Sequence, residues 1–301
     1  MTAYWSGEAH SSIPKAARLA GIAAERCRII PVDAEFAMLP DALAAAMADD
    51  VARGLVPGVV VATFGTTSST ACDPLRAIGS AARAHGAWNH IDAAWGGSAA
   101  ILPELRPLLD GVELADSFVT NPHKWMMTNF DCTAYFVRDV DALLRTFSVS
   151  PEYLRTRHDS DVVNYRDWGI PLGRRFRALK LWFVLRSYGV DGLQAMIRTH
   201  IAFGQELSRW VDAAPEWERL APSPLALVCL RHVPPSLAGD EPALAAHNAA
   251  LLERVNASGE VFLTHTLLGG KYTIRVAIGA WRTERRNLET VWALLREAAS
   301  R

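Results

Sequence analysis

The chain of 301 residues is 50% hydrophobic and 21% charged, which suits a protein with a large buried core and argues against disorder or a coiled coil. Its 31 Lys and Arg residues balance its 32 Asp and Glu residues, so no basic surplus indicates a nucleic-acid partner. No apolar run approaches the roughly 20 residues that span a bilayer, and the four cysteines include no Cys-x-x-Cys pair. We therefore expect a cytoplasmic protein without a membrane segment, a signal peptide or a zinc ribbon.

Short apolar runs alternate with helical patterns in the first half of the chain. The β-branched run over residues 59–64 predicts a strand buried on both faces. Asp73-Pro74 and His85-Gly86 are typical of the start and the end of a helix. Further strands are predicted at residues 88–92, 114–119 and 132–137. Strands that alternate with helices in this way predict a mainly parallel sheet covered by helices.

The second half of the chain has a different pattern. Long helices are predicted at residues 173–189 and 192–213. They are followed by predicted strands at residues 225–230 and 272–278 and by predicted helices at residues 242–257 and 283–298. This order indicates a smaller α+β unit. We place the boundary near Lys180, which divides the chain into domains of residues 1–180 and 181–301.

A lysine follows the predicted strand at residues 114–119, within the segment Asn121-Pro122-His123-Lys124-Trp125. Lys124 has apolar neighbours, and burying an ammonium group costs several kcal/mol unless it is paired or neutralised. Desolvation lowers the pKa of a lysine, and a neutral amine can form a Schiff base with a carbonyl compound. A surface lysine at a strand end is equally consistent with this segment alone.

An aspartate ends the predicted strand at residues 88–92. His90 and Asp92 point to the same side of that strand, and Asp92 lies at its carboxyl end, where open parallel sheets bind ligands. The small residues at positions 93, 94, 96 and 97 allow a flat group to approach the backbone. Such an aspartate can hold a protonated pyridine nitrogen. It can also cap the next segment, or bind a metal together with His85 and His90, although that spacing matches no zinc motif.

Lys124 and Asp92 are expected to face one crevice, because both follow strands of one parallel sheet. A Schiff-base lysine and an aspartate for a pyridinium nitrogen are the pair that pyridoxal phosphate chemistry needs. The ring nitrogen must stay protonated to accept the electrons that are released at the substrate α-carbon. A nearby carboxylate keeps it protonated by opposite-charge stabilisation.

Six motifs in one order carry a specific resemblance that runs from Tyr4 to about Arg296. They are Tyr4-x-Ser6-x-x-x-His10-x-Ser12, His90-Ile91-Asp92-Ala93-Ala94, Ala115-Asp116-Ser117-Phe118, Asn121-Pro122-His123-Lys124-Trp125, Asn129-Phe130-Asp131-Cys132 and Ile170-Pro171-Leu172-Gly173-Arg174-Arg175-Phe176-Arg177. Together they resemble the pyridoxal-phosphate-dependent group II decarboxylases, most closely the aromatic-L-amino-acid decarboxylases. The resemblance implies an α/β protein with the PLP-dependent transferase-like fold (fold type I), in which a small C-terminal α+β domain follows part of the large domain.

The resemblance also implies roles for single residues. Lys124 matches the Schiff-base lysine, and Asp92 matches the partner of the pyridine nitrogen. His10 matches the histidine that stacks on the cofactor ring, and Ala94 matches the small residue under its opposite face. Thr66 matches a threonine near the phenolic oxygen of the cofactor and the substrate. Each of these residues taken alone is also consistent with a structural role.

Four further residues complete the expected site. Asn121 and His123 match residues that help to hold the cofactor phosphate. Tyr153 lies in a polar, unpatterned stretch that suggests a mobile loop, and it matches the tyrosine that reprotonates the α-carbon. Relatives with Phe at this point yield aldehydes, so Tyr153 favours an amine product. Gly173 matches a position where substrate preference varies, and its small size favours a large aromatic substrate.

Relatives of this kind carry a long segment ahead of the tyrosine motif. That segment includes helices that interlock two subunits and a loop that grips the cofactor phosphate. We therefore expect the C-terminal portion of the fold, with apolar surface exposed where the segment would pack. The expected assembly is a homodimer, or a complex with a chain that supplies the segment.

Three functional hypotheses follow. The first is decarboxylation of an aromatic L-amino acid, such as tryptophan, tyrosine or a hydroxylated form, with pyridoxal phosphate as the cofactor. The second is decarboxylation of glutamate or histidine. The third is a catalytically silent chain that pairs with a complete subunit.

Overall fold

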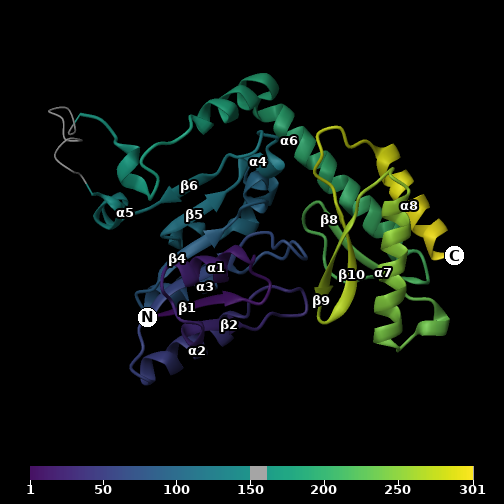
Figure 1. Cartoon of the computed structure of the whole chain (residues 1–301), viewed down its shortest axis with the longest axis horizontal. Coiled ribbons are helices and arrows are strands. Elements are labelled where there is room, and N and C mark those ends of the chain that lie inside the picture. The colour runs from purple at the N-terminus through teal and green to yellow at the C-terminus, as the bar shows by residue number, and fades with distance from the viewer. Residues whose placement is uncertain (150–160, 301) are drawn as a thin grey trace.

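The computed structural model describes residues 1–149 and 161–300, which form two units joined by a long helix (Figure 1). The first unit holds a six-stranded sheet in the order β2-β1-β3-β4-β5-β6. Strands β1 to β5 are parallel, and β6 runs antiparallel to β5. The strands are β1 (Thr2–Ser6), β2 (Cys27–Ile30), β3 (Pro57–Thr63), β4 (Trp88–Asp92), β5 (Ser117–Thr120) and β6 (Ala134–Val137).

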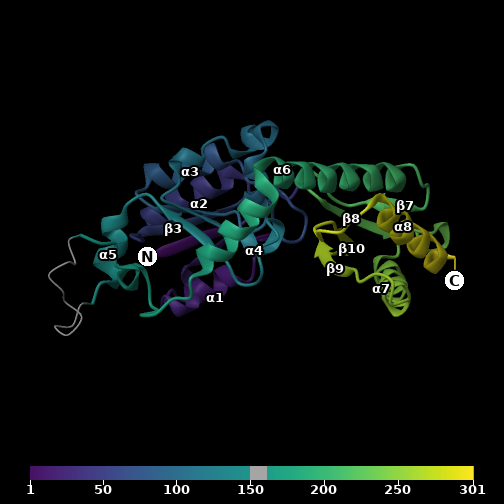
Figure 2. The same ribbon diagram turned by 90° about the horizontal axis from the view of Figure 1, so that it is seen from above.

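Helices cover both faces of this sheet (Figure 2). The helices of this unit are α1 (Ser12–Leu19), α2 (Pro40–Ala52), α3 (Leu75–Ala84), α4 (Pro122–Trp125) and α5 (Val140–Phe147). Figure 2 shows α2 and α3 on one face and α1 on the other. Alternate residues of β1 serve the two faces, because Tyr4 packs in the cluster with Leu43 of α2, whereas Trp5 packs with Ala17 of α1.

The second unit is built on an antiparallel sheet in the order β7-β8-β10-β9. Its core includes Leu230, Leu251, Ile274 and Leu295, all of which are buried. Its elements are α6 (Arg177–Asp212), β7 (Trp217–Arg219), β8 (Leu227–His232), α7 (Glu241–Ala257), β9 (Thr264–Leu268), β10 (Lys271–Ala277) and α8 (Arg285–Ala299).

Helix α6 contains the two helices predicted from the sequence at residues 173–189 and 192–213, although the first of them begins only at Arg177. Its two parts are joined at Gly189, which has φ 67° and ψ 171°, so the helical path breaks there. Glycine adopts this positive φ without the strain that a Cβ atom would cause. The boundary predicted near Lys180 falls inside α6 and stays a prediction.

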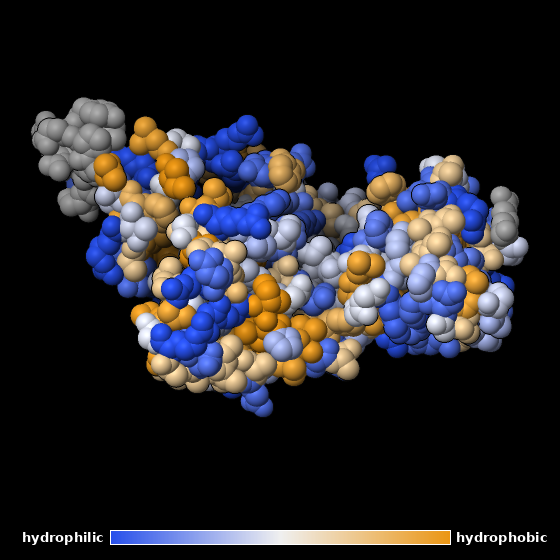
Figure 3. All heavy atoms as spheres, turned by 60° about the horizontal axis from the view of Figure 1, so that its bottom comes forward, coloured by the Kyte–Doolittle hydropathy of each residue, from blue (hydrophilic) through white to orange (hydrophobic). Residues whose placement is uncertain are grey.

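Large apolar side chains are exposed around the start of α6. Phe176 is 75% exposed, and Trp182 and Phe183 are more than half exposed. Figure 3 shows hydrophobic atoms gathered in separate patches on one face of the molecule. This agrees with the expectation of uncovered apolar surface. None of the helices in the described part of the chain is long and apolar enough to cross a membrane.

Candidate active site

Three neighbouring strand ends and one loop build a pocket. β3, β4 and β5 pair side by side, with Thr63 opposite Asp92 and Asp92 opposite Val119. Their carboxyl ends therefore meet at one edge of the sheet. A pocket of about 470 Å³ opens there and is lined by His10, Ser12, Ile13, Thr63, Gly65, Thr67, His90, Asp92, Ala94, Trp95, Val119, Asn121 and Lys124. Five residues expected at the site, all of them in this list, thus share one crevice.

Lys124 lies on α4, directly after β5, and lines the pocket. Its side chain is exposed, which agrees with the surface lysine that the sequence left open as an alternative and not with a desolvated amine. The physical reason is that its neighbour Trp125, which is fully buried, takes the core position of the turn. The amine of Lys124 has no hydrogen-bond or ion-pair partner among the described residues. It is therefore available to a ligand in the pocket.

The turn that carries Lys124 is anchored by a stack of aromatic rings. Trp95, a wall of the pocket, stacks on Trp125 with 4.1 Å between the ring centroids. The indole N–H of Trp125 donates to Nδ1 of His200 on α6 at 3.0 Å. Burial lowers the pKa of His200, and a backbone hydrogen bond with Ala280 opposes this shift only in part. The imidazole is therefore neutral at pH 7, and its Nδ1 can accept the indole N–H of Trp125. His200 was not predictable from local pattern, because its contact with Trp125 spans 75 residues.

Asp92 ends β4 and is buried. One carboxylate oxygen accepts the backbone N–H of Ala94 at 3.0 Å, as a capping role would predict, and the other oxygen is left for a ligand. His90 lies on the same side, and its Nδ1 is 2.8 Å from the hydroxyl oxygen of Ser117. Burial lowers the pKa of His90, although Asp92 opposes this shift. No group of three metal-ligating side chains occurs among the described residues, which contradicts the metal alternative.

His10 and Asn121 are held by local hydrogen bonds. The backbone N–H of Ser12 donates to Nδ1 of His10 at 3.2 Å. The backbone N–H of Asn121 donates to the carbonyl of Ala94 at 2.9 Å, and its side-chain carbonyl accepts the Thr133 hydroxyl at 2.9 Å. The bonds of Asn121 connect the start of α4 to the turn after β4 and to the segment before β6, whereas the bond of His10 lies within the loop after β1.

A smaller pocket of about 230 Å³ adjoins the first, because both are lined by Gly65, Thr67, Trp95 and Lys124. Thr66 lines only the smaller one, and its hydroxyl is bonded to that of Ser69 at 2.9 Å. The other lining residues are Thr70, Leu227, Arg275 and Ala277. The second unit thus forms one wall of the site.

Arg275 is a site residue that the sequence reasoning missed. It lies on β10, and three of its groups donate to the carbonyls of Thr67 and Ser68 and to the hydroxyl of Thr264. A guanidinium has five N–H groups, so two remain for a ligand. Burial lowers the pKa of Arg275, but a guanidinium stays charged in proteins. A lone arginine in the apolar predicted strand at residues 272–278 was the available signal.

Two expected residues, His123 and Gly173, do not line the pockets. Nδ1 of His123 lies 2.7 Å from the backbone carbonyl of Cys132, and the imidazole lines neither pocket. Gly173 lies in an exposed loop, where a Cβ atom would meet no atom within 4 Å. Tyr153 lies outside the described residues.

The backbone at Gly96 packs closely against the backbone at Phe64, next to the pocket residues Gly65 and Trp95. A Cβ atom on Gly96 would lie 2.3 Å from the carbonyl oxygen of Phe64, so only glycine fits there. The hydroxyl groups of Thr63 and Thr70 line the pockets, and each is buried without a hydrogen-bond partner. Such groups mark a place where a ligand or water is expected to bind.

Comparison with known proteins identifies the family. Residues 1–233 match the pyridoxal-dependent decarboxylase conserved domain, so the chain belongs to this family. The whole chain is 45% identical to phenylacetaldehyde synthase of Arabidopsis thaliana and covers 62% of it. It is 44% identical to tryptophan decarboxylase 2 of Oryza sativa subsp. japonica and covers 61% of it. The chain therefore spans about three fifths of the curated relatives that it matches.

Solved structures agree with this assignment. The crystal structure of Oryza sativa TDC with PLP and tryptamine matches 99% of this chain and 62% of that chain, with a TM-score of 0.97 and 39% identity. The structure of Catharanthus roseus tryptophan decarboxylase in complex with L-tryptophan has a TM-score of 0.92 and 38% identity, again over 99% and 62%. The expected PLP-dependent transferase-like fold is confirmed.

The cofactor of this family, pyridoxal phosphate, fits the residues of the larger pocket. The pocket holds an amine with no partner, a carboxylate with one open oxygen, an imidazole and an unpaired buried hydroxyl. The small side chain of Ala94, which lines the pocket, leaves room for a flat ring. These are the groups that an aldehyde with a pyridinium ring requires.

Proposed function

We propose that this chain carries the catalytic part of an aromatic L-amino acid decarboxylase, which releases carbon dioxide and forms the amine. The observation that carries this proposal is the meeting of Lys124 and Asp92 in one pocket. The 44% identity to tryptophan decarboxylase 2 supports the choice of an aromatic substrate.

The residues of the larger pocket are proposed to have different roles in binding the cofactor. Bound pyridoxal phosphate supplies an electron sink for the electrons released when a carboxylate leaves the α-carbon. Lys124 is proposed to attach the cofactor covalently through its free amine. Asp92 is proposed to keep the pyridine nitrogen protonated with its open oxygen. His10 and Ala94 are proposed to hold the ring from its two faces, and Asn121 to assist at the phosphate. His123, whose imidazole lines neither pocket, is proposed to assist only from outside, through its bond to the backbone of Cys132.

The smaller pocket is proposed to receive the substrate. Arg275 offers the two N–H groups that are not used within the chain, and these can attract the α-carboxylate and orient the amino acid. Trp95 and Leu227 give the same pocket apolar walls for an aromatic side chain. Thr66 is proposed to lie beside the substrate and the cofactor oxygen.

Proton return decides the product. Tyr153 is proposed to protonate the α-carbon after carbon dioxide leaves, which yields the amine. A second candidate function is aldehyde formation, which the 45% identity to a phenylacetaldehyde synthase favours. Gly173 is proposed to admit a large aromatic side chain, and glutamate and histidine are the competing substrates.

We also propose how the chain assembles. The exposed apolar side chains around the start of α6 support a homodimer, or a complex with a chain that supplies the N-terminal segment of the relatives. A catalytically silent chain is the competing outcome. A cytoplasmic location is also proposed, and the four free cysteines agree with it.

The test is a product analysis. The chain is supplied with pyridoxal phosphate and with the N-terminal segment of a relative, and it is given L-tryptophan, L-tyrosine, L-glutamate or L-histidine. We expect carbon dioxide and amine from the aromatic substrates only. In Tyr153→Phe assayed under air, the amine yield should fall by roughly a hundredfold to ten-thousandfold. Dioxygen is then the oxidant, and aldehyde, ammonia and hydrogen peroxide form in place of the amine. Aldehyde from the parent chain would favour the second candidate, and no product with any substrate would favour the silent chain.

A further inference from the structure

A hollow of about 850 Å³ lies in the second unit and shares no lining residue with the two pockets of the candidate active site. It is formed where the end of α6, the turn into β7 and one face of α8 come together, and Figure 2 shows these elements at the C-terminal end of the molecule. The lining residues are Trp210, Ala213, Ala214, Pro215, Glu216, Trp217, Glu289, Trp292, Ala293 and Arg296. The residues from α8 have the spacing of one helix face.

Three tryptophans dominate the walls of this hollow. The rings of Trp217 and Trp292 have centroids 5.1 Å apart at an angle of 57°. Trp217 is backed by His232 at 4.9 Å, and the guanidinium of Arg285 lies over Trp210 at 5.8 Å. All three indoles are only half-buried, so they offer ring surface to a ligand. Such a set of indoles suits a planar aromatic group, which packs against their faces and edges.

One negative and one positive charge at the hollow remain available. Glu289 is paired with Arg285, which also binds Glu206 at 2.7 Å. Glu216 has one side-chain partner, Nε2 of the neighbouring His232 at 3.3 Å. Arg296 is exposed and has no hydrogen-bond or ion-pair partner within residues 1–149 and 161–300.

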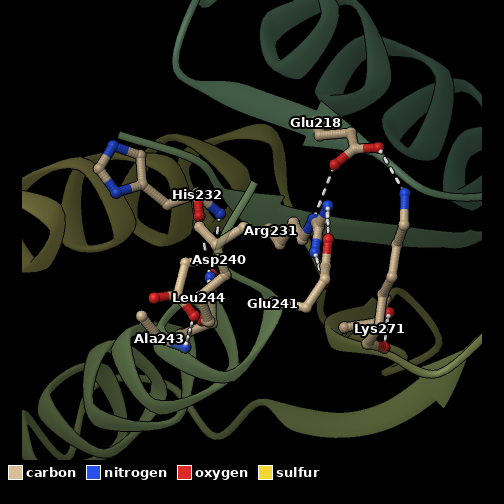
Figure 4. A network of polar contacts seen from close by, with 10 residues as sticks. Glu218, Arg231, His232, Asp240, Glu241, Ala243, Leu244 and Lys271 are labelled. Atoms are coloured by element: carbon tan, nitrogen blue, oxygen red, sulfur yellow. Dashed lines mark hydrogen bonds and ion pairs between the residues drawn. The ribbon is translucent and has the colours of Figure 1, made fainter. Parts of the chain in front are cut away.

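The charges deeper in the same unit are paired. Figure 4 shows Arg231 between Glu218 and Glu241, with 2.7 Å to each, and Lys271 on the other oxygen of Glu218 at 3.3 Å. Like the exposed Arg209 and Arg282, Arg296 stands outside this network, but of these three arginines only Arg296 lines the hollow beside the indoles. Guanidinium groups bind carboxylates through two parallel hydrogen bonds. The unpaired guanidinium of Arg296 therefore indicates a ligand that has a carboxylate.

We propose that this hollow is a second binding site for an aromatic L-amino acid, separate from the site of reaction. The aromatic ring packs among the three indoles, the α-carboxylate pairs with Arg296, and the ammonium group pairs with Glu216. The carboxyl end of α6 at Asp212 adds the negative end of a helix dipole on the ammonium side. Only residues of the hollow take part in this binding, so it is independent of cofactor binding at Lys124.

The test uses Lys124→Ala without added cofactor and measures heats of binding for three ligands. L-Tryptophan has the ring and both charges, tryptamine lacks the carboxylate, and indole-3-propionate lacks the ammonium group. We expect L-tryptophan to bind, with each of the other two ligands roughly ten- to hundredfold weaker, and the variants of the hollow distinguish this binding from binding at Arg275. Equal affinity for tryptamine, or no binding of L-tryptophan, would overturn the proposal.

Substitutions in the hollow test whether the ligand binds there. Arg296→Gln should weaken L-tryptophan roughly ten- to hundredfold and remove its advantage over tryptamine. Glu216→Gln should do the same relative to indole-3-propionate, and Trp292→Leu should weaken all three ligands. Arg282→Gln, an exposed arginine outside the lining, is the matched control and should change nothing. Unchanged binding in Arg296→Gln and Trp292→Leu, with far-ultraviolet circular dichroism intact, would place the ligand elsewhere and contradict the proposal.

Discussion

The two units differ in how completely their buried polar side chains are hydrogen-bonded. In the first unit, buried side-chain atoms without a partner belong to Ser6, Glu8, Thr63, Thr70, Asn89, Ser98, Thr120 and Thr128. Within residues 177–300, all of which are described, there is no such atom. An unpaired buried group costs about 1–3 kcal/mol, so the first unit tolerates a cost that the second unit avoids. Of the first set, Thr63 and Thr70 line the pockets of the candidate site, which suits a binding role, whereas Figure 4 shows charged groups of the second unit paired with one another.

The strongest challenge to this contrast is Asp92→Asn. The amide oxygen can still accept the N–H of Ala94, so the fold should hold. The counter-charge for the cofactor is lost, and removing one partner of a buried charged pair costs roughly 2–5 kcal/mol. Decarboxylation should therefore fall by roughly thirtyfold to a few thousandfold. Asp110→Asn, at an exposed ion pair with Arg76, is the matched control, and equal rates in the two variants would remove Asp92 from the mechanism.

The corresponding change in the second unit is Arg231→Met. The guanidinium is buried and bonded to Glu218 and Glu241, whose side chains are more than a third exposed. Because solvent screens the exposed ends, we expect a loss of only about 1–2 kcal/mol in the free energy of unfolding, measured by urea denaturation. Arg219→Met, at the more exposed pair with Asp212, should change it by less than about 0.5 kcal/mol. Equal losses would show that the buried network adds no stability.

A matched pair of threonines sharpens the comparison. Thr63 on β3 and Thr273 on β10 are both buried, but only the hydroxyl of Thr273 has a partner, the carbonyl of Lys271 at 2.9 Å. Thr63→Val removes an unpaired hydroxyl at nearly constant shape, so the free energy of unfolding should stay equal or rise by up to about 1 kcal/mol. Thr273→Val should lose about 1 kcal/mol. The reverse order in urea denaturation would contradict the contrast between the units.

The smallest expected effect is a dependence on pH. Burial lowers the pKa of His90, His200 and His247 below the ordinary value of 6.5. Between the lowered pKa and 6.5 the unfolded chain binds more protons than the folded chain, so stability is full above about pH 6.5 and falls as the pH drops. His247→Gln should flatten this decline. A free energy of unfolding that rises on acidification from pH 7 to pH 5.5 would contradict the assignment.

Much of the first sheet was predictable from local pattern. The strand at residues 88–92 was predicted with the bounds that β4 has, and the helix at residues 73–85 contains α3. β1 and β2 were missed, because they are short and their pairing with each other and with β3 is not a local property. The three-residue strand β7 was missed for the same reason.

The candidate site was predictable where it depends on strand ends. Asp92 and Lys124 follow neighbouring parallel strands, so topology alone places them together. Arg275 and His200 were not predicted, because they reach the site only when the second unit packs against the first. Whether Lys124 is buried or exposed was not predictable, because an apolar sequence neighbourhood does not fix which side chain of a turn enters the core.

The most direct test is to map the lysine that holds the cofactor. The chain is incubated with pyridoxal phosphate, reduced with borohydride and digested, and the labelled peptide is identified by mass spectrometry. We predict label on Lys124, loss of the label and of the visible absorption band in Lys124→Ala, and retention of both in Lys15→Ala, which removes an exposed lysine of α1. Label that persists in Lys124→Ala with the same absorption band would contradict the site described above.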